Sequence, residues 1–98
     1  MRFDIVFTPE ALEDLRLFRK SEQTRIIGAI EEQLSHEPNS ETRNRKRLRP
    51  NQTAEWALRV DRFRVFYDIV EAAGLVKIEA IGHKRGSRLF IQGEEYHL

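Results

Sequence analysis

The densest group of residues able to bind an anion lies between positions 43 and 49. Five of these seven positions are basic and none is acidic: Arg43, Arg45, Lys46, Arg47 and Arg49. Guanidinium and ammonium groups stay charged at neutral pH and donate hydrogen bonds to phosphate oxygens. The run therefore indicates either a site for a polyanion, or a solvated loop whose cations meet acidic groups elsewhere in the chain.

Two further basic groups follow along the chain. They comprise Arg59, Arg62 and Arg64, and then His83, Lys84, Arg85 and Arg88. Groups so far apart in sequence can meet only if strands of one sheet bring them together. A sheet is therefore the element that must position any shared site.

Arg64 is the strongest single candidate in these groups. The apolar side chains of residues 63–67 alternate with it, which predicts that Arg64 points away from the core. A guanidinium there can hold a phosphate bidentately and stabilise charge that builds up on it, although it cannot act as a base. The competing interpretation is a cross-strand ion pair with Glu55, Asp61 or Glu79.

His83 and Phe90 are candidates for other roles at the same site. The imidazole of His83 can exchange protons near neutral pH, and nearby Lys84 and Arg85 would lower its pKa, which favours a general base. The alternative is an inert surface histidine. Phe90 can stack on a nucleobase, a contact worth about 1–3 kcal/mol, or it can simply pack against its neighbours.

Composition excludes several classes of protein. The chain has 98 residues, 40% hydrophobic and 34% charged, so we expect one domain spanning residues 1–98. It has no cysteine and three scattered histidines, which argues against thiol chemistry, a metal site and any cofactor. No apolar run reaches the roughly 20 residues of a membrane span, and no signal peptide is recognisable. We therefore expect a cytoplasmic protein without a membrane partner.

The net charge of +1 conceals a strong asymmetry along the chain. Residues 1–42 carry 5 basic and 9 acidic side chains, whereas residues 43–88 carry 12 basic and 5 acidic ones. This segregation predicts one positively charged face, able to attract a polyanion or an acidic protein.

The N-terminal third predicts a strand followed by two helices. Alternation over residues 2–7 indicates a strand with one buried face, and Thr8-Pro9 indicates the N-cap and first residue of a helix. The expected apolar stripe of this helix consists of Ala11, Leu12, Leu15 and Phe18. Asp14 falls on its remaining faces. Ser21 is the expected N-cap of a second helix, which ends before Pro38.

The rest of the chain predicts a loop followed by three strands. Residues 39–54 form the expected loop, anchored by Leu48, with residual helix around residues 45–48. Strands are expected over residues 56–60, 63–69 and 75–81. The turn at Asp61-Arg62 needs a strained or bulged geometry because it lacks glycine. In the last strand, the shared face is expected to hold Val76, Ile78 and Ala80.

The order of these elements predicts an α+β fold. A two-helix hairpin would pack on one face of a small, twisted, mainly antiparallel sheet that the N-terminal strand extends. The opposite face would then be bare, and the cations from several strands would gather there.

These features resemble the RelE/ParE superfamily of bacterial toxins from type II toxin–antitoxin pairs. The resemblance covers nearly the whole chain and rests on five segments: Thr8-Pro9-Glu10-Ala11, Lys46-Arg47-Leu48, Trp56-Ala57-Leu58-Arg59-Val60, Phe63-Arg64-Val65-Phe66-Tyr67 and Ile81-Gly82-His83-Lys84-Arg85. The RelE-like branch cleaves messenger RNA in the ribosomal decoding site without a metal, using the 2′-hydroxyl of the substrate. The ParE-like branch inhibits DNA gyrase.

The resemblance to the RelE-like branch implies roles for individual residues. Arg64 matches its phosphate-binding arginine, and Lys84 or Arg85 matches its second cation. His83 or Lys84 would move protons, and Phe90 would stack on a base. The remaining cations would bind RNA: Arg43, Arg45, Lys46, Arg47, Arg49, Arg59, Arg62 and Arg88.

The sequence departs from the RelE-like pattern at three positions. Glu55 and Ala57 stand where some RelE-like enzymes have paired lysines, and Phe90 replaces a tyrosine and so cannot transfer a proton. His83 or Lys46 are alternatives for the general base. These departures keep open a gyrase inhibitor or a degenerate member that only binds an antitoxin. Expected partners are an acidic antitoxin, together with the ribosome and mRNA or, in the alternative, gyrase.

Overall fold

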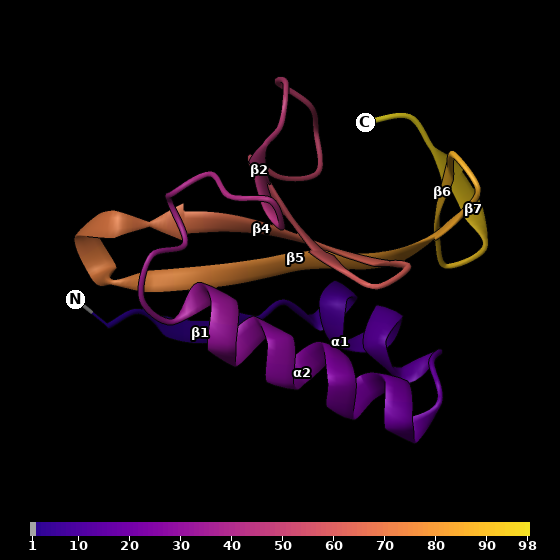
Figure 1. Ribbon diagram of the computed structural model, residues 1–98, viewed down its shortest axis with the longest axis horizontal. Helices are drawn as coiled ribbons and strands as arrows, with labels where there is room; N and C mark the ends of the chain where they lie inside the picture. The colour runs from indigo at the N-terminus through magenta and orange to yellow at the C-terminus, as the bar shows by residue number, and fades with distance from the viewer. Residues whose placement is uncertain (1) are drawn as a thin grey trace.

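Strands and helices follow one another along residues 2–98, the part of the chain that this computed structural model describes (Figure 1). The elements are β1 (Asp4–Phe7), α1 (Pro9–Arg16), α2 (Lys20–Leu34), β2 (Arg45–Arg47), β3 (Trp56–Val60), β4 (Phe63–Val70), the 3-10 turn η1 (Glu71–Ala73), β5 (Leu75–Arg85), β6 (Arg88–Ile91) and β7 (Glu94–Tyr96). Among these residues, no helix is long and apolar enough to cross a membrane.

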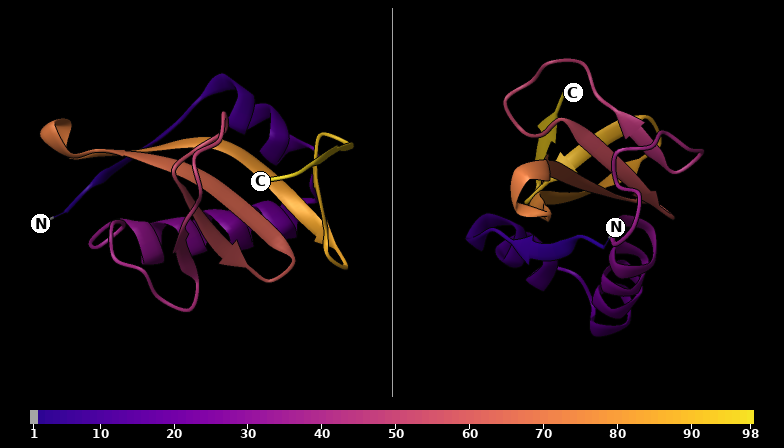
Figure 2. Two further views of the ribbon diagram at one scale, coloured as in Figure 1. Left: turned by 90° about the horizontal axis from the view of Figure 1, so that it is seen from above. Right: turned by 90° about the vertical axis from the view of Figure 1, so that its left-hand side faces the viewer.

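The strands form one seven-stranded sheet in the order β2-β3-β4-β5-β6-β7, and β1 pairs with β5 outside this path. β1 runs parallel to β5, whereas the other neighbouring strands are antiparallel. Both helices lie on the same side of the sheet, as the views in Figures 1 and 2 show. The predicted α+β fold, with two helices on one face of a mainly antiparallel sheet, is confirmed.

The predicted start of α1 is confirmed, and that of α2 is wrong. Thr8 caps α1, because its hydroxyl accepts a hydrogen bond from the Ala11 amide at 3.0 Å. α2 begins at Lys20 with Arg19 as its N-cap, so Ser21 lies inside the helix. The Glu22 carboxylate accepts the Arg19 amide at 3.0 Å, which satisfies this backbone donor without a serine cap.

The segment expected to be a loop with residual helix contains the edge strand β2, so the helix prediction is wrong. β2 pairs antiparallel with β3, which lies several residues further along the chain. The Arg45 guanidinium donates to the carbonyl of Ser40 at 3.0 Å and to that of Gln33, near the end of α2, at 2.8 Å. These bonds hold β2 beside the helix, a contact that no local sequence signal contains.

The predicted alternation in β3 and β4 is confirmed. Their helix-facing side chains form the main core with α1 and α2: Trp56, Leu58, Val60, Phe63, Val65 and Tyr67. The buried Tyr67 hydroxyl donates to the Pro38 carbonyl at 2.7 Å, which fixes the chain after α2. Asp61 in the turn has φ of 55°, a left-handed conformation that is uncommon for residues other than glycine, in line with the strained or bulged turn that we expected.

A β-bulge in β5 reverses the predicted faces of its second half. Phe66 pairs with Ala80 and Tyr67 with Ile78, so Glu79 has no partner on β4. Beyond the bulge, Ile81 faces the helices whereas Ala80 faces the other way. The expectation that Ala80 shares a face with Ile78 is wrong, because the extra residue shifts the two-residue period by one.

The sequence led us to expect a bare sheet face opposite the helices, and this prediction is wrong. A second, smaller core covers part of it, made of Ala54, Phe66, Ala80, Leu89 and Ile91. β6 supplies two of these residues by passing close over Gly82, where a Cβ would lie 2.5 Å from the Phe90 carbonyl oxygen. The close approach requires glycine at this position.

The faces of α1 also differ from expectation at two residues. Leu12 was placed in the apolar stripe but is 38% exposed, and Asp14 was placed on a polar face but is buried. The Asp14 carboxylate accepts the Ile81 amide at 2.9 Å. This amide lies on the edge of β5 between the stretches that pair with β1 and β6, so it needs an acceptor from outside the sheet.

Glu79 at the bulge gives a pH dependence of stability. Burial, and then the hydrogen bond to Asp68, raise the pKa of Glu79 above its usual value. The folded state therefore binds more protons than the unfolded state between the usual and the raised pKa, so stability falls as the pH rises through that window. We expect Glu79→Gln to remove this fall and to be more stable than the wild type at neutral pH by less than about 1 kcal/mol.

Urea unfolding at several pH values between 4 and 7 checks this prediction. The difference between wild type and Glu79→Gln reports the contribution of this carboxyl together with its contacts to Asp68 and Lys77. A difference that stays constant with pH would contradict the assignment.

Candidate functional site

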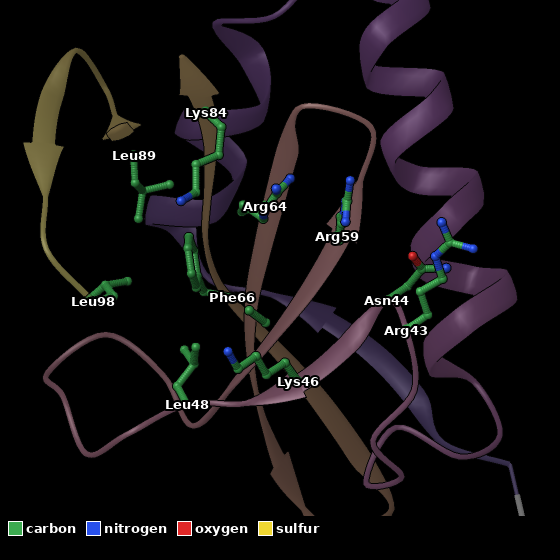
Figure 3. A pocket seen from close by; sticks show the side chains of 11 residues that line it. Arg43, Asn44, Lys46, Leu48, Arg59, Arg64, Phe66, Lys84, Leu89 and Leu98 are labelled. Carbon is green, nitrogen blue, oxygen red and sulfur yellow. The ribbon is translucent and has the colours of Figure 1, made fainter. Parts of the chain in front are cut away.

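A shallow cavity of about 360 Å³ opens on the sheet face opposite the helices (Figure 3). Its lining comes from β2 to β6, the loops on either side of β2 and the C-terminal segment: Arg43, Asn44, Lys46, Leu48, Ala57, Arg59, Arg64, Phe66, Lys84, Leu89 and Leu98. Lys46 and Lys84 reach toward the space over Phe66 from different strands (Figure 3). Residues far apart in sequence thus share one concave surface.

The cavity is strongly cationic. Five of its lining side chains are basic and none is acidic: Arg43, Lys46, Arg59, Arg64 and Lys84. Within residues 2–98, none of the five takes part in an ion pair. Uncompensated like charges repel each other, so the arrangement favours an anionic ligand that would neutralise them.

Arg64 lines the cavity from β4. Its guanidinium donates to the backbone carbonyls of Asp61 at 3.0 Å and Phe63 at 2.8 Å, so its position is fixed without using a carboxylate. Partial burial, followed by the charge of Arg59, lowers the pKa of the Arg64 guanidinium, which nevertheless stays charged at any working pH. The alternative of an ion pair with Glu55, Asp61 or Glu79 does not occur.

Arg59 faces Arg64 directly across the β3–β4 ladder. Like charges at opposite positions of a sheet destabilise the pair. Within the described residues, no carboxylate forms an ion pair with either arginine, so this repulsion is not relieved.

Replacing Arg59 should therefore separate stability from function. We expect Arg59→Thr to raise the free energy of unfolding by about 0.2–1 kcal/mol, because it removes the repulsion and places a β-branched residue in a strand. The same change should weaken anion binding. Urea denaturation measures the first effect and titration with inorganic phosphate, followed by NMR, the second, with Arg59→Lys as the control that keeps the charge. A loss of stability in Arg59→Thr would contradict the repulsion.

The comparison with known proteins agrees with this fold. A model of the family described as the ParE toxin of type II toxin–antitoxin systems, parDE, matches residues 5–87. The chain belongs to this family. The match also confirms the resemblance to RelE/ParE toxins that the sequence motifs carry.

A solved structure shows the same fold in a related context. The crystal structure of the toxin–antitoxin complex RelBE2 from Mycobacterium tuberculosis contains a chain 24% identical in sequence, with a TM-score of 0.75. The alignment covers 86% of this ParE-family toxin and 93% of that chain. No curated protein sequence matches the toxin significantly.

The basic run of the toxin divides between two faces. Lys46 of β2 faces the cavity, whereas the side chains of Arg45 and Arg47 point to the other face of the strand. Arg45 holds the backbone of Ser40 and Gln33, and Arg47 pairs with Glu55 at 3.5 Å. Arg43 and Lys46 reach the cavity, and Arg49 is exposed outside it.

The candidate group at the end of β5 is also divided. Lys84 faces the cavity of the toxin, whereas His83 packs on the helix side against Phe18 and stacks on Phe90, with ring centroids 6.0 Å and 5.7 Å apart. Burial, then Arg62 and Arg85, lower the pKa of His83. The structure therefore does not bring His83, Arg85 or Phe90 together with Arg64.

The two remaining arginine candidates of the toxin form ion pairs away from the cavity. Arg62 contacts Glu22 at 2.7 Å and lies over Phe63, and Arg88 contacts Glu95 at 2.8 Å. These pairs connect the β3–β4 turn with α2 and β6 with β7. Within the described part of the chain, no three His, Cys, Asp or Glu side chains gather as ligands for a metal ion.

Sequence reasoning missed the apolar part of the cavity. Phe66, Leu89 and Leu98 line it beside the cations. Phe66 alternates with the core residues of β4, which was a usable signal for a position on the cavity side. Leu98 had no such signal, because its place depends on how the C-terminal segment folds back.

Proposed function

We propose that this toxin is a ribosome-dependent mRNA endoribonuclease that acts without a metal ion. The observation that supports it most is the convergence of five cations, none paired with a carboxylate in the described structure, on one cavity beside apolar side chains. Such a surface suits a phosphodiester together with its base. Cleavage would inhibit translation in the cytoplasm.

The proposed reaction uses the 2′-hydroxyl of the RNA as nucleophile. Its oxygen attacks the adjacent phosphorus, the bond from phosphorus to the 5′-oxygen breaks, and the products are a 2′,3′-cyclic phosphate and a 5′-hydroxyl. A base takes the proton of the 2′-hydroxyl and an acid gives one to the leaving oxygen. Arg64 and Arg59 would stabilise the negative charge of the pentacoordinate intermediate.

Lys46 and Lys84 are the proposed proton carriers. Guanidinium groups do not release protons in proteins, whereas a lysine can accept a proton as an amine and donate one as an ammonium. His83 lies on the other face of β5, so it is not part of this proposal. Lys46 pairs in register with Ala57, one of the positions where some RelE-like enzymes have paired lysines, and would supply the missing amine from the neighbouring strand.

Lys84 and Arg85 form a matched pair for testing the proposal, because neighbouring residues of β5 face opposite sides of the sheet. We expect primer extension on mRNA from cells expressing the toxin to show cuts. Lys84→Met should reduce cutting by about 100-fold or more, as for the loss of an acid–base group, and Arg85→Met should leave it unchanged. Absence of cuts with the wild-type toxin would reject the nuclease.

A second candidate function is the inhibition of DNA gyrase. The matched family model is that of the ParE toxin, and no His, Asp, Glu or Tyr side chain is among the described residues of the cavity. In this case the cationic surface would bind protein rather than cut RNA. A supercoiling assay with purified gyrase and stoichiometric toxin separates the two, since only this second function predicts inhibition.

An acidic antitoxin is the proposed partner in either case. The exposed cations of the cavity offer a complementary surface to an acidic segment that folds on contact. A degenerate toxin that only binds its antitoxin would bind this segment but show neither RNA cuts nor gyrase inhibition.

A further inference from the structure

The cavity has two chemically different sides (Figure 3). Arginines occupy the side toward α2 and the β3–β4 turn: Arg43, Arg59 and Arg64. Apolar side chains occupy the side toward the C-terminal segment: Leu48, Phe66, Leu89 and Leu98. A purely ionic ligand would leave the second side unused.

Two of these four apolar side chains, Leu89 and Leu98, belong to a part of the chain outside the family match. The matched residues end at 87, and β6 and β7 follow as a hairpin over the second core. Gly82 permits its close approach, since a Cβ there would meet the Phe90 carbonyl oxygen at 2.5 Å and the Ile91 side chain at 2.8 Å. Leu89 is only 6% exposed, and Leu98 at the rim is 44% exposed.

Polar contacts hold the hairpin in place. The Gln92 side-chain amide donates to the buried Asp14 carboxylate, and the Arg88 guanidinium contacts Glu95 at 2.8 Å. The apolar wall is therefore already formed before a ligand binds, which reduces the entropy cost of binding.

A nucleotide combines the two chemistries that this cavity offers. Its volume of about 360 Å³ is at the lower end of the range for small-ligand sites, which suits one nucleotide unit rather than a larger ligand. We infer that the C-terminal hairpin forms a base subsite, in which a nucleobase packs between Leu48, Leu89 and Leu98 while its phosphate contacts Arg59 and Arg64. This inference rests on the proposed function and specifies its substrate.

The polar groups beside the apolar wall favour particular bases. In their ammonium form, Lys46 and Lys84 offer hydrogen-bond donors and no acceptor atom. Guanine and uracil present carbonyl oxygens to such donors, whereas adenine and cytosine present amino groups at the corresponding positions. The subsite should therefore prefer guanine and uracil.

Binding of mononucleotides tests the subsite without the ribosome. We would titrate purified toxin with 3′-GMP, 3′-UMP, 3′-AMP and 3′-CMP, and with ribose 5-phosphate as a base-free probe, and follow amide shifts by NMR. We expect 3′-GMP and 3′-UMP to bind about fivefold or more tightly than the other three probes. Equal binding of 3′-GMP and ribose 5-phosphate would overturn the inference.

Variants at the rim locate the effect. Leu98→Ser and Leu48→Ser should each weaken 3′-GMP about threefold or more and leave ribose 5-phosphate unchanged, because they shorten only the apolar wall. Leu17→Ser is the matched control, since Leu17 is 66% exposed and does not line the cavity. Neither rim leucine is buried, so the variants should keep the wild-type NMR spectrum elsewhere.

Mononucleotide binding and mRNA cleavage together distinguish failure of the base subsite from failure of the proposed nuclease. Base-selective binding without cuts in mRNA would support the subsite and reject the nuclease. Cuts in mRNA together with unselective mononucleotide binding would support the nuclease and overturn the subsite. Unchanged 3′-GMP binding in both rim variants would also overturn it.

Discussion

Arg64→Ala is expected to abolish growth inhibition and to lower the rate of mRNA cleavage by about 10²–10³-fold. The magnitude is that for removing one preorganised donor to a charge that develops in the transition state. The Asp61 and Phe63 carbonyls already hold the guanidinium in place, at 3.0 and 2.8 Å, so little reorganisation is needed when the phosphate binds. Primer extension and colony counts after induction measure the two effects.

Arg62→Ala is the matched control for this variant. Arg62 lies two residues away in the same hairpin, but its guanidinium contacts Glu22 and does not line the cavity. Its loss should cost at most about 1 kcal/mol of stability and leave cleavage intact. Arg64→Lys should show intermediate activity, because an ammonium keeps the charge but not the bidentate geometry. Full toxicity of Arg64→Ala would contradict the proposed phosphate site.

Asp14→Ala is expected to cause the largest loss of stability, about 3 kcal/mol. The Asp14 carboxylate is 2% exposed and accepts hydrogen bonds from the Ile81 amide and the Gln92 side chain. Alanine leaves the buried Ile81 amide without a partner and releases the turn after β6. In a chain of this size the loss should lower Tm by more than about 10 °C.

Thermal unfolding monitored by circular dichroism measures this effect. Glu13→Ala is the control, because Glu13 is the exposed neighbour of Asp14 and should change stability by no more than about 0.5 kcal/mol. Asp14→Asn keeps an acceptor for the Ile81 amide and should lose less than Asp14→Ala. Equal Tm values for Asp14→Ala and Glu13→Ala would show that these hydrogen bonds contribute little.

The position of Asp14 also shows where prediction from periodicity fails. Helical spacing identified Leu15 as buried, and the structure confirms it. The same spacing placed Asp14 outside, since a carboxylate is rarely buried without a partner. Its partner is a backbone amide of β5 that becomes free only because β1 ends and β6 begins on either side of it. The burial of Asp14 therefore depends on the strand pairing of the assembled sheet and could not be predicted from helical periodicity.

The candidate site was predicted in part. Alternation in β4 placed Arg64 on the face away from the main core, and the structure confirms that position. A bulge adds one residue and shifts the two-residue period of a strand. The sequence pattern therefore could not predict whether His83 or Lys84 lies on the same face as Arg64. Because Glu79 bulges and has no partner on β4, Lys84 faces the cavity and His83 packs against Phe18.

What the sequence determined by itself is local: the Thr8 cap, the strands over residues 56–60 and 63–69, and the α+β order of elements. These depend on hydrogen bonds and side-chain periods within a few residues. The tertiary structure alone decided that β2 joins the sheet edge, that Glu79 bulges, and that the C-terminal hairpin closes over Gly82. Each of these depends on partners distant in the chain, whose packing and backbone pairing exist only after the sheet has formed.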